Sequence, residues 1–172
     1  MATQTAVLVP LDVYLRTCDY EPDVEYVDGH LEERNPGEFD HNTVQQALLI
    51  WFHEHRKEWR VRAIQEQRMR VSATRVRIPD VCVYGEDYPV EQVFAAPPLV
   101  CIEVLSPEDR RSRMNEKIAD YRAFGVKNIW VIDPKRQTGW DVSSGDWKTE
   151  TRFVIEGTPV YLDLAELHAH VE

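Results

Sequence analysis

The sequence has few cysteines and none in a pairing that builds a metal centre. Cys18, Cys82 and Cys101 form no Cys-x-x-Cys pair, which is the usual spacing of structural zinc sites. Cys82 and Cys101 lie inside apolar patterns typical of strands, where a thiol is most often a small core residue. We therefore expect neither a disulfide nor a zinc ion to hold this fold together.

Long hydrophobic runs are also missing. The first residues, MATQTAVLVPLDVYL, have no basic segment ahead of an apolar stretch, and nowhere do about eighteen apolar residues run together. We therefore expect a cytoplasmic protein without a membrane span. No repeat or Gly/Ser linker interrupts the 172 residues, of which 43% are hydrophobic, so residues 1–172 are expected to form a single domain.

Positive charge is scarce, because 20 lysines and arginines face 30 aspartates and glutamates, for a net charge of −10. This balance argues against a protein that coats nucleic acid, which needs basic side chains at the phosphates. Residues 56–77 are the exception, with eight basic and two acidic side chains. A basic face there would bind DNA, with Arg68, Arg70 and Arg75 as candidates, although a solvated face without a ligand is the commoner outcome.

The spacing of apolar residues predicts alternating strands and helices. Residues 24–27 and 30–33 flank Asp28-Gly29, which suits the tight turn of a hairpin. Asp40 is placed to cap a helix that ends near Arg56. From Trp59 the period changes to two, which predicts an antiparallel hairpin with one basic and one apolar face.

Three nearly all-apolar segments, residues 81–84, 99–105 and 128–134, predict buried strands. A helix from about Ser112 to Phe124 separates the last two and ends at Gly125, a natural C-terminal cap. Added strands and a short helix over 162–171 complete the chain. The order helix, three strands, helix, strand predicts an α/β (α+β) fold with a mixed central sheet, an N-terminal hairpin and C-terminal added strands.

Two carboxylates interrupt the apolar strands. Asp80 follows Pro79, which lacks a backbone donor and permits a bend, and Glu103 lies within the run CIEVL. Burying a carboxylate among apolar side chains costs free energy unless the carboxylate binds a partner. For Asp80 the alternative is an ordinary cap or turn residue at a strand end.

Lys117 is predicted to reach the same place from the helix. On a helical wheel it falls between Tyr121 and Phe124, where a lysine needs an anion as partner. Glu103 lies about 7 Å before the end of its strand, and Lys117 lies about 7 Å after the start of its helix. The two side chains therefore reach the same level if the helix folds back over the sheet. Alternatively, Lys117 extends past the rings to water. Two acids and a lysine suit a magnesium-dependent phosphodiesterase, because Mg²⁺ takes oxygen ligands and lysine stabilises charge at the attacked phosphate.

Three motifs follow one another along the chain: VEYVDGHLEERNPGEFDHNTVQQAL, RIPDVCVYG and LVCIEVLSPEDRRSRMNEKIADYRAFGVKNIWVIDP. Together they resemble the Uma family of restriction endonucleases, a branch of the PD-(D/E)XK nuclease superfamily, over essentially the whole chain. The resemblance implies a restriction-endonuclease-like core with Asp80 and Glu103 as metal-binding acids. The chain departs from the common motif at Leu105, where the superfamily has lysine, and Lys117 would be the displaced replacement.

Further polar residues are candidates beside the acids. The resemblance marks His41, Glu25 and Glu33 as accessory positions, although a surface histidine and exposed hairpin carboxylates are the commoner interpretations. Ser106 and Arg110 follow the strand that carries Glu103 and could contact a phosphate beside the site. A Ser-Pro corner is also ordinary turn chemistry.

We therefore expect hydrolysis of DNA phosphodiesters with Mg²⁺ or Mn²⁺ held by Asp80, Glu103 and the carbonyl of Val104. A homodimer is expected by analogy, since so small a nuclease often spans a duplex with a second copy. One alternative is a non-catalytic module that binds nucleic acid or protein on a nuclease-like scaffold. The other is an ordinary α/β domain in which Lys117 and Glu103 form only a structural ion pair. Of these three hypotheses, only the nuclease requires a divalent metal bound by both Asp80 and Glu103.

Overall fold

The computed structural model describes residues 8–17 and 24–171. Its largest sheet is mixed, because one of its strand pairs is parallel and the others are antiparallel. In spatial order its six strands are β10 (Lys148–Glu150), β9 (Thr138–Asp141), β8 (Asn128–Asp133), β7 (Val100–Val104), β6 (Val81–Gly85) and β3 (Val61–Gln65). The parallel pair is β7–β8, and the predicted mixed central sheet is confirmed.

A second sheet carries the N-terminal hairpin. Its four antiparallel strands are, in spatial order, β2 (His30–Glu33), β1 (Val24–Val27), β5 (Arg75–Arg77) and β4 (Met69–Arg70). Asp28 and Gly29 have φ values of 50° and 93°, so the predicted Asp-Gly turn is confirmed. A separate antiparallel pair joins β11 (Arg152–Val154) to β12 (Tyr161–Asp163).

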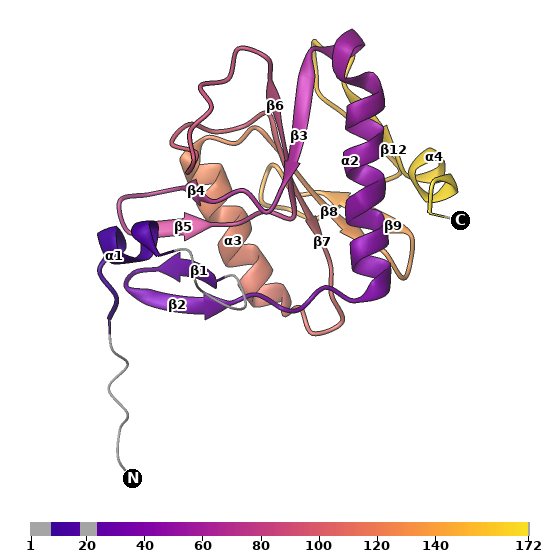
Figure 1. The fold of residues 1–172 in the computed structure, drawn as a ribbon. Coiled ribbons are helices and arrows are strands. Elements are labelled where there is room, and N and C mark those ends of the chain that lie inside the picture. The colour runs from indigo at the N-terminus through magenta and orange to yellow at the C-terminus, as the bar shows by residue number, and fades with distance from the viewer. Residues whose placement is uncertain (1–7, 18–23, 172) are drawn as a thin grey trace.

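Helices cover both faces of the six-stranded sheet. The described residues form α1 (Leu11–Arg16), α2 (Phe39–Trp59), α3 (Arg111–Phe124) and α4 (Leu164–Ala169). Figure 1 places α2 and α3 on opposite sides of this sheet. None of the helices in the described ranges combines the length and the hydropathy that a membrane span requires.

The helix ends follow their local sequence, with one correction. Gly125 ends α3 with φ of 105°, as predicted. The predicted cap at Asp40 is wrong, because α2 begins one residue earlier and Glu38 occupies the cap position without a side-chain hydrogen bond. Asp40 instead lies in the first turn, where a negative charge still favours the helix N-terminus.

The predicted antiparallel hairpin after Trp59 is confirmed for β4 and β5, which pair with each other, but β3 does not join it. Strand β3 pairs with β6, whereas β4 pairs with β5 in the other sheet. Alternation of apolar residues indicates a strand but does not specify its partner. The chain changes sheets again between β5 and β6, where Pro79 and Asp80 permit the expected bend.

Alternation along the central strands sorts the core into two layers. Val100 and Ile102 of β7 pack in the cluster formed with α2, whereas Cys101 packs in the cluster formed with α3. Cys82 also lies on the α3 side, and both thiols are buried and free, as predicted. Cys18 lies outside the described residues. Each fully buried aliphatic side chain contributes about 1.5–3 kcal/mol, so these layers hold the sheet that positions the acids.

Candidate active site

The register of β6 against β7 brings Asp80 opposite Glu103. Cys82 and Cys101 are partners in this antiparallel pair. Asp80 lies two residues before Cys82, and Glu103 lies two residues after Cys101, so the same register sets the two acids opposite each other. Alternate residues of a strand share a face, which places both acids on the α3 side. Both are buried and line one pocket. Their meeting follows from the sheet register, while their role in metal binding stays a prediction.

Helix α3 places Lys117 between acids from two sheets. Its Nζ lies 2.9 Å from Glu103 Oε2 and 3.0 Å from Glu25 Oε1, and it donates to the carbonyl oxygen of Ile78 at 3.0 Å. The predicted contact with Glu103 is confirmed. The alternative in which Lys117 extends to water is wrong, because the residue is buried. Glu25 comes from β1 and is buried as well, so it is not an exposed hairpin carboxylate.

Asp80 is held by donors from several directions. Oδ1 accepts a hydrogen bond from Arg34 Nη2 at 2.8 Å, and Oδ2 accepts one from the Val104 N–H at 2.7 Å. His41 Nε2 lies 3.3 Å from Oδ2, so the interpretation of His41 as a surface residue is wrong. Gln45 Nε2 donates to the Asp80 carbonyl oxygen at 2.9 Å, which fixes the backbone at the bend.

These neighbours keep Asp80 ionised. Burial would raise the pKa of Asp80, but the hydrogen bond from His41 and the positive charges of Lys117 and Arg34 lower it to about 2. Burial would lower the pKa of His41, yet the Asp80 carboxylate raises it above 6.5. The pair therefore favours a charged aspartate and a protonated imidazole.

Glu103 behaves in the opposite way. Burial and the negative charges of Asp80 and Glu25 raise the pKa of Glu103 to about 7, although Lys117 opposes the shift. Burial would lower the pKa of Lys117, but the charges of Glu103, Glu25 and Asp80 raise it, so the ammonium stays protonated. Negative charge is in excess around Glu103, and an added cation or a proton would relieve it.

A pocket of about 50 Å³ opens onto these groups. Asp80, Glu103, Val104 and Lys117 line it, and we call it the candidate active pocket. Its lining also includes Asn35 after β2, Ser106 and Asp109 in the loop after β7, and Arg110 and Arg113 at the start of α3. The pocket gives the two buried carboxylates a route to solvent and to a substrate.

The oxygen donors of this pocket fit a hard divalent cation. Asp80 and Glu103 supply carboxylates and Val104 a backbone carbonyl, and Mg²⁺ takes such ligands while keeping several waters. The raised pKa of Glu103 is the observation that supports the fit, because a cation would offset the crowded negative charge. Over residues 8–17 and 24–171, no group of three or more His, Cys, Asp or Glu side chains forms a metal centre, so an ion here would depend on water for most of its ligands.

Sequence reasoning missed two residues that hold the acids. Tyr121, expected in the core, is buried there, but its hydroxyl also donates to Glu103 Oε1 at 2.6 Å. Its spacing of four residues from Lys117 was a usable signal, because such residues share a helix face. Arg34 had no comparable signal, since it follows β2 and meets Asp80 only through the fold.

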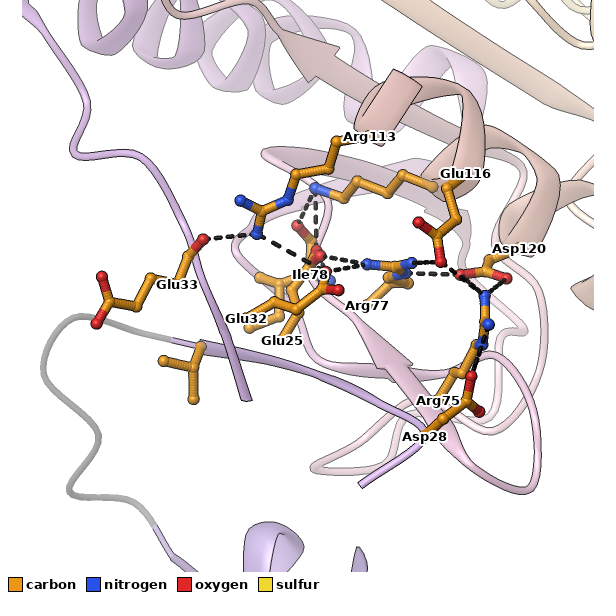
Figure 2. Close-up of polar contacts among 12 residues, drawn as sticks. Glu25, Asp28, Glu32, Glu33, Arg75, Arg77, Ile78, Arg113, Glu116 and Asp120 are labelled. Carbon is orange, nitrogen blue, oxygen red and sulfur yellow. Dashed lines mark hydrogen bonds and ion pairs between the residues drawn. The ribbon is translucent and has the colours of Figure 1, made fainter. Parts of the chain in front are cut away.

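The arginines predicted to form one basic face are divided in the structure. Arg75 and Arg77 lie in a network of ion pairs (Figure 2), which we call the Arg77 network; its acids are Glu25, Asp28, Glu32, Glu116 and Asp120. Arg77 is 0% exposed, with Nε 2.7 Å from Asp120 Oδ2 and Nη1 2.9 Å from Glu25 Oε2. The predicted single face is wrong, and Arg75 is withdrawn as a DNA contact because three carboxylates share its guanidinium.

The remaining candidates lie apart from that network. Arg70 is exposed, and Arg68 is half-buried with its guanidinium 5.8 Å from the centre of the Tyr14 ring. Arg110 is exposed at the rim of the candidate active pocket. Glu33 is exposed and lies outside the pocket lining, so the structure gives it no place beside the acids.

Comparison with known proteins places the chain among nuclease-like folds. A solved structure from Anabaena variabilis ATCC 29413, titled a "putative nuclease belonging to DUF820", shares 22% identity and a TM-score of 0.78. The match covers 95% of this chain and 99% of that one, which shows that the fold is shared. No curated protein matches the chain. The Uma2 family, described as "Putative restriction endonuclease", matches residues 11–152, and because this is most of the sequence, the chain belongs to the Uma2 family.

Proposed function

We propose that this chain is a divalent-metal-dependent DNA endonuclease that hydrolyses phosphodiester bonds. One observation carries the proposal: Asp80 and Glu103 converge on one pocket while the Lys117 ammonium lies 2.9 Å from Glu103. Buried titratable groups with shifted pKa values in a cleft are typical of active sites. The family match and the shared nuclease-like fold support the same reaction class.

The residues of the pocket have separable tasks in this proposal. Asp80, Glu103 and the Val104 carbonyl would hold Mg²⁺ or Mn²⁺, which when bound lowers the pKa of a water and neutralises phosphate charge. Lys117 stays protonated and stabilises negative charge that develops on the attacked phosphate. Glu25 fixes the ammonium from β1, and His41 orients the Asp80 carboxylate.

A non-catalytic module is the second candidate, and one observation favours it. All four carboxylate oxygens of Asp80 and Glu103 already have a protein donor within 2.9 Å, as in a purely structural cluster. Leu105 also stands where the superfamily motif has lysine. Such a module would bind nucleic acid or protein on the nuclease-like scaffold without cleaving it.

Cleavage of DNA separates these candidates. The purified chain is incubated with mixed supercoiled, linear and single-stranded DNA in Mg²⁺, in Mn²⁺ and in a chelator. We expect cleavage only with metal, and loss of at least about 100-fold in rate in Asp80→Asn. Glu150→Gln, on an exposed residue of β10, is the matched carboxylate control. Metal-independent cleavage, or an active Asp80→Asn variant, contradicts the proposal.

We also propose that the working unit is a homodimer of one-domain subunits. The support is the size of the chain, 20.1 kDa, because two-fold symmetry lets two small subunits face the two strands of a duplex. Light scattering is expected to give about twice this mass. A monomer at concentrations where DNA is cleaved contradicts it.

A further inference from the structure

The N-terminus of α3 opens onto the candidate active pocket beside the acids. Arg110 occupies the cap position without a side-chain hydrogen bond, and the first turn contains no acidic residue. Met114 N–H donates to the Arg110 carbonyl oxygen at 3.1 Å, so the N–H groups of residues 111–113 precede the first helical hydrogen bond. Such N–H groups need an acceptor from outside the helix and favour an anion.

Ser106 is the second, independent observation. It is 8% exposed and lines the pocket, and its hydroxyl makes no hydrogen bond to any described residue. Its backbone is occupied, because the N–H donates to Asp109 Oδ2 at 2.6 Å and the carbonyl accepts from Asp109 N–H at 3.0 Å. Because this hydroxyl lines the pocket and has no partner among the described residues, it is free to donate to a ligand that enters there.

The charges around Ser106 favour an anion. Arg110 is exposed and has no acidic partner among the described residues. Arg113 donates through Nη2 to the Glu33 carbonyl oxygen at 2.5 Å, and only Glu32 lies near it, at 3.8 Å. Asp109 lines the pocket too, but Asn35 Nδ2 donates to its Oδ1 at 2.9 Å and the Ser106 N–H to its Oδ2.

We propose that Ser106, Arg110 and the N-terminal N–H groups of α3 form a second phosphate subsite, which binds a phosphate next to the one attacked at Asp80 and Glu103. This inference rests on the proposed function for the class of its ligand. A hydroxyl, a guanidinium and helix N–H groups are all donors, and a phosphate group presents several acceptor oxygens to them at once. The subsite holds the substrate strand in position and takes no part in bond breaking.

The ligand is a phosphate of nucleic acid, and two sources supply one: an internal phosphodiester and a terminal 5′-phosphate. Both are tested by titrating ¹⁵N-labelled full-length protein, without divalent metal, and following the amide signals of residues 111–113. The probes are the dinucleotide TpT, with one internal phosphodiester, and thymidine 5′-monophosphate. We expect shifts at these amides with at least one probe, and a Kd weakened about tenfold or more in Ser106→Ala/Arg110→Gln.

Arg62→Gln is the matched control, since it removes the same charge from an exposed side chain of β3, outside the lining of the candidate active pocket. Its Kd is expected to stay within about twofold. Shifts with TpT assign an internal phosphodiester, and shifts with the monophosphate alone assign a strand end. Absent shifts, or shifts that survive the double substitution, overturn the subsite. This titration does not measure cleavage. A protein that shows the amide shifts but does not cleave DNA would therefore contradict the proposed function and leave the phosphate subsite standing.

Discussion

Two clusters of buried charge meet at Glu25, and they differ in how their charges are matched. In the Arg77 network both arginines are surrounded by carboxylates, and the positive charges of Lys117 and Arg77 keep the pKa of Glu25 lowered against the effect of burial. In the candidate active pocket, burial and two neighbouring acids raise the pKa of Glu103 to about 7. In a matched cluster each buried charge has an opposite charge beside it, whereas an unmatched one holds free energy that a ligand can release.

Removing Arg77 tests the matched cluster and has the largest expected effect. Arg77→Met keeps much of the side-chain volume but removes one of the two cationic partners of Glu25 and of Asp120, which then keep only Lys117 and Arg75 respectively. The free energy of unfolding should fall by about 3–5 kcal/mol, measured by denaturant unfolding. Arg70→Met, on an exposed residue, should change it by less than about 0.5 kcal/mol. Equal stability of both variants would show that the network contributes little.

Removing Lys117 tests the unmatched cluster. Lys117→Met keeps the stem but deletes the charge beside Glu103, and in Mg²⁺ we expect near-wild-type stability with cleavage reduced by a factor on the order of 100 or more. Lys127→Met, on an exposed lysine, is the control for both measurements. Retained cleavage would exclude Lys117 as the displaced catalytic lysine. A large stability loss that magnesium does not rescue would favour a structural ion pair.

The pH dependence of stability sharpens the contrast. Because the pKa of Glu103 rises from 4.5 to about 7 on folding, the folded chain holds a proton that the unfolded chain releases between these values. Without divalent metal, this group should lower the free energy of unfolding as pH rises from 4.5 to 7, by about 3 kcal/mol at most. Glu103→Gln should flatten this part of the curve. An unchanged slope in that variant would assign the pH dependence elsewhere.

The arginines outside both clusters should have the smallest effect. Replacing Arg68 and Arg70 by alanine should weaken DNA binding and reduce the log–log salt slope by up to about two units, if both meet phosphates. Lys148→Ala, on exposed β10, serves as the charge control. An unchanged slope would leave this surface as solvated charge.

Sequence reasoning succeeded where one element determines the outcome. The Asp28-Gly29 turn, the end of α3 at Gly125 and the position of Lys117 inside an apolar helix face depend on local spacing. Each needed only the period of a helix or the backbone freedom of a turn. The contact between Lys117 and Glu103 followed from two such local patterns.

It failed where the partner comes from a distant segment. Nothing near Arg75 indicates that Asp28 and Asp120 will surround it, so its charge looked free. His41 looked exposed because its burial depends on the bend at Asp80 from another part of the chain. Strand pairing failed in the same way at β3, since periodicity defines a face but not a neighbour.

The central claim is that Asp80 and Glu103 hold one divalent ion. Crystals grown with Mn²⁺ test it most directly, because anomalous scattering locates the ion and its ligands. The account predicts one strong peak at about 2.0–2.6 Å from oxygens of both carboxylates, with the Val104 carbonyl as a further ligand. No peak in the pocket at saturating Mn²⁺, with Arg34 and Lys117 still paired to the two acids, would contradict it.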